Sequence, residues 1–305
     1  MAAVNRLFSP ARLLALFTSL TGSLRGPAPA SAAALLLVPL LVPLALGGSI
    51  AGAQATEILP HKAIYTLHNR ESVGDNDSLS ADGMLIFEWT DTCDGWQVNQ
   101  RAKLRLIGDK GETDFEWRQI TWEAKDGHSY RYQSQEFQDG QKGEQRQGEV
   151  SLDDKGVPQL TMAAPERNQS ALPSGVLLPT AHSMRLLKAA ATGETYVAAD
   201  VFDGTVSDTP MKIGAAIAPA ASQLPDQSKD FPPLANVGSH VIDLAFYLKD
   251  GDPAGLPDFE QSMRLYDNGV IGHMSFPFAG VDMVGDLAKL DAVPTGKCKA
   301  ATVSP

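Results

Sequence analysis

The stretch that decides the fold is Trp96-Gln97-Val98-Asn99-Gln100-Arg101-Ala102-Lys103-Leu104-Arg105-Leu106. Its apolar and polar side chains alternate, with one exception at Gln100. Because successive side chains of a strand point to opposite faces, the pattern predicts an antiparallel strand with one buried and one solvated face. The buried face would carry Trp96, Val98, Ala102, Leu104 and Leu106.

The same alternation continues on both sides of this stretch. Phe87 and Trp89 share a face before it, and Phe115 and Trp117 share a face after it. Asp-Gly pairs separate the runs, as hairpin turns do, so the sequence predicts an up-and-down meander. Further strands are expected at 58–67, 144–152, 157–163, 195–203, 205–215, 238–248, 258–267, 269–276 and 280–290.

One short helix is expected over residues 181–192. Pro179-Thr180 before it and Gly193 after it are typical start and stop signals. Its apolar stripe would be Met184, Leu187 and Ala191, and we expect Met184 and Leu187 to pack against the concave side of the sheet. The fold class is therefore all-β, a curved antiparallel sheet with one short helix at its mouth.

The first 55 residues are typical of a cleavable signal peptide. Three arginines precede an apolar run over residues 32–47, and small residues follow it at 51–55. The run is shorter than a membrane-spanning helix needs, and two prolines interrupt it. We expect an exported protein with one domain over residues 56–305, in which the Ala- and Pro-rich residues 216–236 form a surface loop. Once cleaved, it would not be an integral membrane protein.

The remaining chain is acidic. The whole sequence has 25 basic and 36 acidic residues, and residues 1–55 hold three arginines and no acid, so the rest carries a formal net charge of −14. Phosphate binding needs clustered Lys and Arg. The charge therefore excludes nucleic acid as a partner, and it also excludes electrostatic docking on anionic lipid.

The two cysteines, Cys93 and Cys298, both lie in the exported part. A lone pair in an oxidising compartment indicates one long-range disulfide, which would hold the C-terminal tail on an early hairpin. Two free thiols or a transient redox pair are the alternative, although no C-x-x-C motif is present.

Candidate catalytic residues are few. Histidines are scattered, and no H-E-x-x-H motif, no His pair at helical spacing and no G-x-S-x-G motif occurs, so neither a metal nor a cofactor is expected. His182, at the start of the expected helix, is the best single candidate for a catalytic residue. The alternative is a structural histidine that ties the loop entering the helix.

Several short motifs carry a resemblance to a known family. They are Cys93-Asp94-Gly95-Trp96, the segment Leu172–His182 with Pro179, Thr180 and His182, the segment Val201-Phe202-Asp203-Gly204, and Arg264–Val270. Together they resemble the EipB-type envelope-integrity family, long known only as a domain of unknown function in alphaproteobacteria. Leu178 stands where members usually carry Phe.

The resemblance implies a periplasmic antiparallel β-spiral, or incompletely closed barrel, loosely like lipoprotein-carrier folds. It implies a disulfide between Cys93 and Cys298 and a role in keeping the envelope intact under stress. It implies no catalytic residue.

Three functions therefore remain open. The first is a non-enzymatic factor that binds a lipid-like ligand or an envelope protein in a concave apolar groove, as a monomer. The groove would be lined by Phe87, Trp89, Phe115, Trp117, Met184 and Leu187. The second is a protein-interaction scaffold with a filled core, and the third is a hydrolase that uses His182.

Overall fold

The computed structural model describes residues 57–70, 79–109, 111–205, 207–219, 224–249, 251 and 254–295. The predicted signal peptide and Cys298 lie outside these residues. The first eight strands are β1 (His61–Asn69), β2 (Leu79–Asp91), β3 (Gly95–Gly108), β4 (Gly111–Ala124), β5 (Ser129–Gln138), β6 (Gln141–Leu152), β7 (Pro158–Ala164) and β8 (Asn168–Ala171). After the helix α2 (Pro179–Thr192) come β9 (Tyr196–Val201), β10 (Met211–Pro219), the short 3-10 helix η2 (Pro232–Leu234), β11 (Ser239–Tyr247), β12 (Phe259–Tyr266), β13 (Ile271–Phe278) and β14 (Val281–Ala292).

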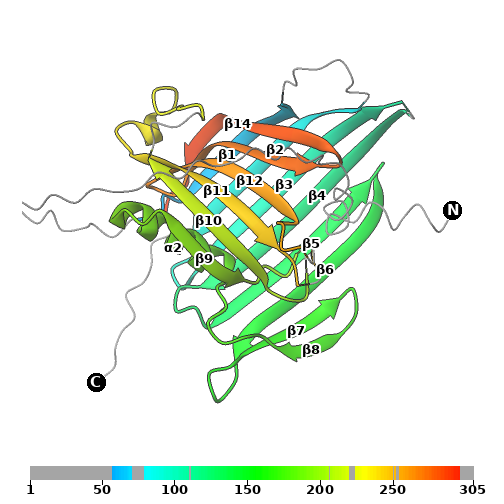
Figure 1. Cartoon of the computed structure of the whole chain (residues 1–305). Helices are drawn as coiled ribbons and strands as arrows, with labels where there is room; N and C mark the ends of the chain where they lie inside the picture. The colour runs from blue at the N-terminus through cyan, green and yellow to red at the C-terminus, as the bar shows by residue number, and fades with distance from the viewer. Residues whose placement is uncertain are drawn as a thin grey trace, which may run out of the picture.

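All the described strands belong to one sheet. The order is β8-β7-β6-β5-β4-β3-β2-β1-β14-β13-β12-β11-β10-β9, and every neighbouring pair is antiparallel. The sheet curves until the later strands face the early meander (Figure 1). It does not close, because β8 and β9 remain its two edges. The predicted all-β, incompletely closed barrel is confirmed.

The main core fills the inner side of this curve. It consists of buried apolar side chains from β1–β4, α2 and β9–β14. Strand β3 buries Trp96, Leu104 and Leu106 there, while its Arg101 and Lys103 are exposed. The predicted two-faced strand is thus confirmed. No helix among the residues described has the length and apolar character needed to span a bilayer.

The two edges of the sheet meet at a short seam. Leu177, just after β8, forms an isolated parallel bridge with Val201 at the end of β9. The Leu177 N–H donates to the Asp200 carbonyl at 2.9 Å, and the Phe202 N–H donates to the Leu177 carbonyl at 2.9 Å. Within the described ranges, this one bridge joins the edges where a closed barrel would have a full ladder.

A second core lies under the seam. Its members come from β5–β7 and from both sides of the seam: Tyr130, Tyr132, Val150, Leu160, Met162, Leu172, Leu178 and Phe202. Phe202 is fully buried, and its ring meets that of Tyr132 edge-on at 6.0 Å. Side-chain packing therefore supplies the closure that backbone pairing lacks.

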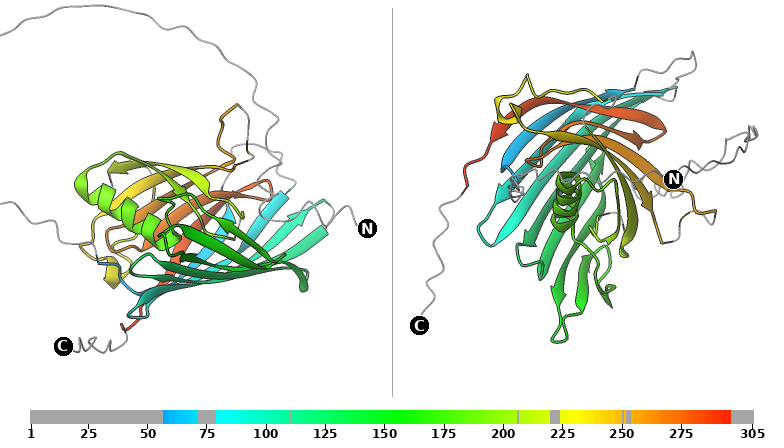
Figure 2. Two further views of the ribbon diagram at one scale, coloured as in Figure 1. Left: turned by 90° about the horizontal axis from the view of Figure 1, so that it is seen from below. Right: turned by 60° about the vertical axis from the view of Figure 1, so that its left-hand side comes forward.

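The helix begins earlier and buries a different face than expected. It starts at Pro179, and its buried side chains are Thr180, His182, Leu186, Leu187, Ala189 and Ala190. Leu187 packs in the main core as predicted, but Met184 is 39% exposed and Ala191 is also exposed, so the predicted stripe is wrong. His182, Leu186 and Ala189 share one face at helical spacing, and Met184, two residues from both His182 and Leu186, lies on the opposite face. In the right-hand view of Figure 2, α2 lies between the later strands and the early meander.

Two predicted boundaries after the helix are also wrong. The strand expected at 205–215 is β10, which begins at Met211, because Phe202 packs in the second core and Gly204 and Asp208 bind Arg146 at the seam. The loop expected at 216–236 loses its first four residues to β10. Its later part is not simply a surface insertion, since Leu234 is fully buried and the guanidinium of Arg264 binds the carbonyls of Leu224 and Pro225.

Candidate functional site

The side chains predicted to line a concave groove lie in the main core. Trp89 is 5% exposed and Phe115 is 8% exposed; their rings contact those of Trp96 at 6.1 Å and Phe278 at 5.3 Å. Phe87 and Trp117 are partly buried against the same core, and Leu187 is 4% exposed. These residues fill the inner side of the sheet by packing on one another. Met184, exposed on the helix, is not among them.

The turn around Cys93 accommodates the side chain of Trp122 from β4. A Cβ atom at Gly95 would stand 2.5 Å from the Trp122 ring, so only glycine leaves room for it. The indole Nε1 of Trp122 donates to the Thr92 hydroxyl at 3.1 Å, and Arg131 stacks over the indole at 4.4 Å. The motif Cys93-Asp94-Gly95-Trp96 thus places Trp122 on the outer face, where alternation with Glu116 predicts it.

The Phe202-Asp203-Gly204 motif forms a loop that packs against β5 and β6 at the seam. Gly204 has φ +72°, and a Cβ there would lie 2.4 Å from the Tyr132 ring. The Tyr130 hydroxyl donates to the Asp203 carbonyl at 2.8 Å, and Arg146 Nε donates to the Gly204 carbonyl at 2.9 Å. Arg146 also forms ion pairs with Glu144 and Asp208. These residues therefore have a structural role in joining the two edges.

The start of α2 is held by a carboxylate that sequence reasoning missed. Glu123 of β4 is 4% exposed and accepts the N–H groups of Thr180 at 2.7 Å and Ala181 at 2.9 Å. It serves as the cap, because the N-cap residue Leu178 has no side-chain oxygen. A signal was present: Glu123 falls on the buried face of β4 if the alternation of Phe115 and Trp117 is continued.

His182 lies in the first turn of this helix and is 7% exposed. Burial lowers the pKa of His182 to about 4, so the ring is neutral at ordinary pH. Its Nε2 is buried and has no hydrogen-bond partner in the part of the chain that the structure describes. Its position fits the structural alternative, in which the ring packs at the entry to the helix.

Replacing Glu123 by alanine should destabilise the protein in a pH-dependent way. Burial, the largest influence, raises the pKa of Glu123 above 4.5 despite the two N–H donors. The folded carboxyl then holds its proton more tightly than the unfolded one, so its contribution falls as pH rises above 4.5. We expect Glu123→Ala to cost about 1–2 kcal/mol near pH 4.5 and less at pH 8, measured by denaturant unfolding. The exposed Glu112→Ala is the control; a loss that grows with pH would contradict the assignment.

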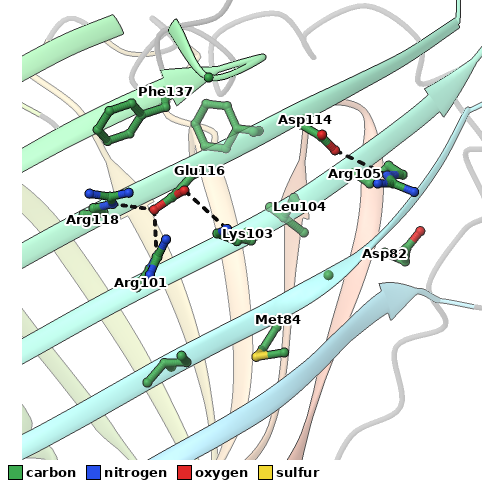
Figure 3. A pocket seen from close by; sticks show the side chains of 14 residues that line it. Asp82, Met84, Arg101, Lys103, Leu104, Arg105, Asp114, Glu116, Arg118 and Phe137 are labelled. Atoms are coloured by element: carbon green, nitrogen blue, oxygen red, sulfur yellow. Dashed lines mark hydrogen bonds and ion pairs between the residues drawn. The ribbon is translucent and has the colours of Figure 1, made fainter. Parts of the chain in front are cut away.

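A hollow of about 870 Å³ lies on the opposite, outer face of the early meander. It spans β2–β5 and was not predicted. Figure 3 shows the side chains that rise from this face, among them Met84, Arg101, Lys103, Glu116, Arg118 and Phe137. Its volume is in the range of small-molecule sites. Its lining combines many charged side chains with apolar ones such as Met84, Ile86 and Phe137.

One carboxylate sits among three cations in this hollow. Glu116 Oε1 lies 2.7 Å from Arg101 Nε and also accepts from Arg118 Nε, and Lys103 Nζ lies 3.7 Å from Oε2. The hydrogen bonds from Arg118 and Arg101 hold the pKa of Glu116 down, at about 2. The cluster therefore keeps a local surplus of positive charge on an acidic protein.

Among the described residues, no group of three or more His, Cys, Asp or Glu side chains is arranged to hold a metal ion.

Comparison with known proteins bears on both fold and family. A curated relative from Brucella abortus (strain 2308), "Cell envelope integrity protein EipB", is 23% identical over 255 residues, which are 83% of this chain and 90% of the relative. A crystal structure of a beta-barrel-like DUF1849 protein from Brucella abortus superposes with a TM-score of 0.71 and 22% identity, covering 78% of this chain and 99% of the other. The EipB-like family model matches residues 52–294. The chain therefore belongs to the EipB-like family.

Proposed function

We propose that this protein acts in the cell envelope, as a non-enzymatic periplasmic factor that maintains envelope integrity by binding. Membership of the EipB-like family supports this most directly, because the curated relative is named for cell envelope integrity. The open sheet with its packed inner side is also better suited to presenting a surface than to enclosing a reaction. The bound species is a lipid-like ligand or an envelope protein.

The binding surface of this proposal is the outer hollow over β2–β5. The inner side is filled by side chains such as Trp89, Phe115 and Leu187, whereas Met84 in the hollow is 45% exposed. Ile107 and Ile120 on the same outer face are 39% and 43% exposed. Exposed apolar side chains that gather on one face mark contact surfaces.

The proposal predicts an envelope defect in cells that lack the protein. A deletion strain should become sensitive to detergents and envelope-directed antibiotics, with normal growth in their absence, and the wild-type gene should restore resistance. A Met84→Ser, Ile86→Ser variant, changed at two apolar residues of the hollow, should fail to restore it while being secreted at the normal level. The exposed helix variant Met184→Ser is the matched control. A deletion strain as resistant as the wild type would refute the function.

The hydrolase alternative is tested by His182→Ala in the same assay. We expect the variant protein to be less stable. Any loss of envelope resistance should match the loss of folded protein. If the purified protein hydrolysed an ester or peptide substrate and this change abolished turnover without unfolding the protein, the enzyme function would replace the binding one.

A further inference from the structure

Two arginines face each other across neighbouring strands in the outer hollow. Arg101 of β3 is the direct cross-strand partner of Arg118 of β4. Like charges in this position repel and destabilise a sheet. Here the carboxylate of Glu116 lies between them and binds both guanidinium groups. The pair thus forms a seat for an anionic oxygen, with Lys103 beside it.

Apolar side chains border this seat. Ile86 is the cross-strand partner of Arg101, Met84 is the partner of Lys103, and Phe137 is the partner of Glu116. The Arg118 guanidinium lies over the Phe137 ring at 4.6 Å. A group that enters the hollow therefore meets cations at its centre and hydrocarbon on both sides.

We propose that the hollow binds a single-chain anionic amphiphile, whose phosphate or carboxylate head is held by Arg101, Arg118 and Lys103 while its chain lies along Met84 and Ile86 of β2. This inference deepens the proposed function and rests on it. Guanidinium groups match the geometry of phosphate and carboxylate oxygens, and charge-assisted hydrogen bonds of this kind are stronger than neutral ones. The ligand's head would replace the Glu116 carboxylate.

The charges around the hollow give the ligand one orientation. At the other end of the hollow, Arg105 is already matched by Asp114 at 3.3 Å and Glu112 at 3.9 Å, so this end offers no surplus cation. The formal net charge of −14 on residues 56–305 opposes approach to an anionic bilayer. A monomeric amphiphile does not meet that long-range repulsion to the same degree. The negative net charge of the sequence gave no indication of this local cluster of cations.

The test uses the exported protein and lysophosphatidylglycerol below its micelle concentration, measured by titration calorimetry at low salt. We expect one-to-one binding that the Arg101→Gln, Arg118→Gln double variant weakens about tenfold or more, since it removes the charged hydrogen bonds to the head. Glu116→Gln should tighten binding, because it removes the competing carboxylate. That gain is a readout that misfolding cannot produce.

Matched controls separate the outcomes. Arg185→Gln removes an arginine of similar exposure on α2 and should leave affinity unchanged. A monoacylglycerol with the same chain and inorganic phosphate should each bind far more weakly than the probe. Equal affinity in the double variant, equal binding of phosphate alone, or binding only to phosphatidylglycerol vesicles would overturn the inference. None of these binding results depends on the deletion phenotype, so the proposed function is tested separately.

Discussion

Replacing Phe202 by alanine should lower the free energy of unfolding by about 3–5 kcal/mol, the usual cost of removing a fully buried aromatic side chain. Phe202 has no exposed surface and packs on Tyr132 in the second core. The cavity would open directly beneath the seam, where one backbone bridge among the described residues joins Leu177 to Val201 at the end of β9. We therefore expect the variant to unfold first at the seam. Denaturant unfolding measures the first effect, and hydrogen exchange of the N–H groups of residues 177 and 202 measures the second.

Tyr196→Ala is the matched control for Phe202. Tyr196 is an aromatic residue of the adjoining strand β9 and is 62% exposed, so its removal should change stability by no more than about 0.5 kcal/mol. If the two variants unfolded at the same denaturant concentration, the second core would not be what closes the sheet.

Loss of the predicted disulfide should have an effect of similar size. Cys93 lies in the tight turn between β2 and β3 with φ +75°, and its N–H donates to Asp91 Oδ1 at 2.8 Å. Cys298 lies outside the described residues, so the bridge stays a prediction. The pair is 205 positions apart, and the chain-entropy model gives roughly 5 kcal/mol for so long a loop, with 2–5 kcal/mol typical of native bridges.

The cysteine experiment has two parts. Non-reducing peptide mapping of the exported protein should recover one peptide pair joined through Cys93 and Cys298. The variants Cys93→Ser and Cys298→Ser should each lower the unfolding midpoint to the same extent, and the double variant should be no less stable than either. Two unmodified thiols in the native protein would contradict the bridge.

The sheet was predictable from sequence because its signal is local. Alternation from Trp96 to Leu106 identified a two-faced strand, and Asp-Gly turns identified the hairpins. The path after Val201 was not predictable in the same way. Residues 205–215 alternate well enough to predict a strand, but Phe202 packs in the second core and Gly204 and Asp208 bind Arg146, so the strand begins only at Met211.

The packing of the inner face was not predictable from periodicity. Periodicity shows which side chains share a face, but not whether a second layer of side chains fills the space in front of it. Phe87, Trp89 and Phe115 share the inner face as predicted, and the later strands and α2 pack against them. The pairing of Arg101 with Arg118 depends on the register between β3 and β4, which the sequence alone left open.

The pairing of β1 with β14 affects how the chain folds, because β1 is synthesised long before its partner. The sheet joins the first described strand to the last: His61 pairs with Ala292, and the Val293 N–H donates to the Pro60 carbonyl at 2.8 Å. Contacts between such distant residues slow folding, because a long loop must close before they form. Nearly the whole chain must therefore be present before β1 finds its partner β14. Until then β1 presents an open edge, which is a template for aggregation.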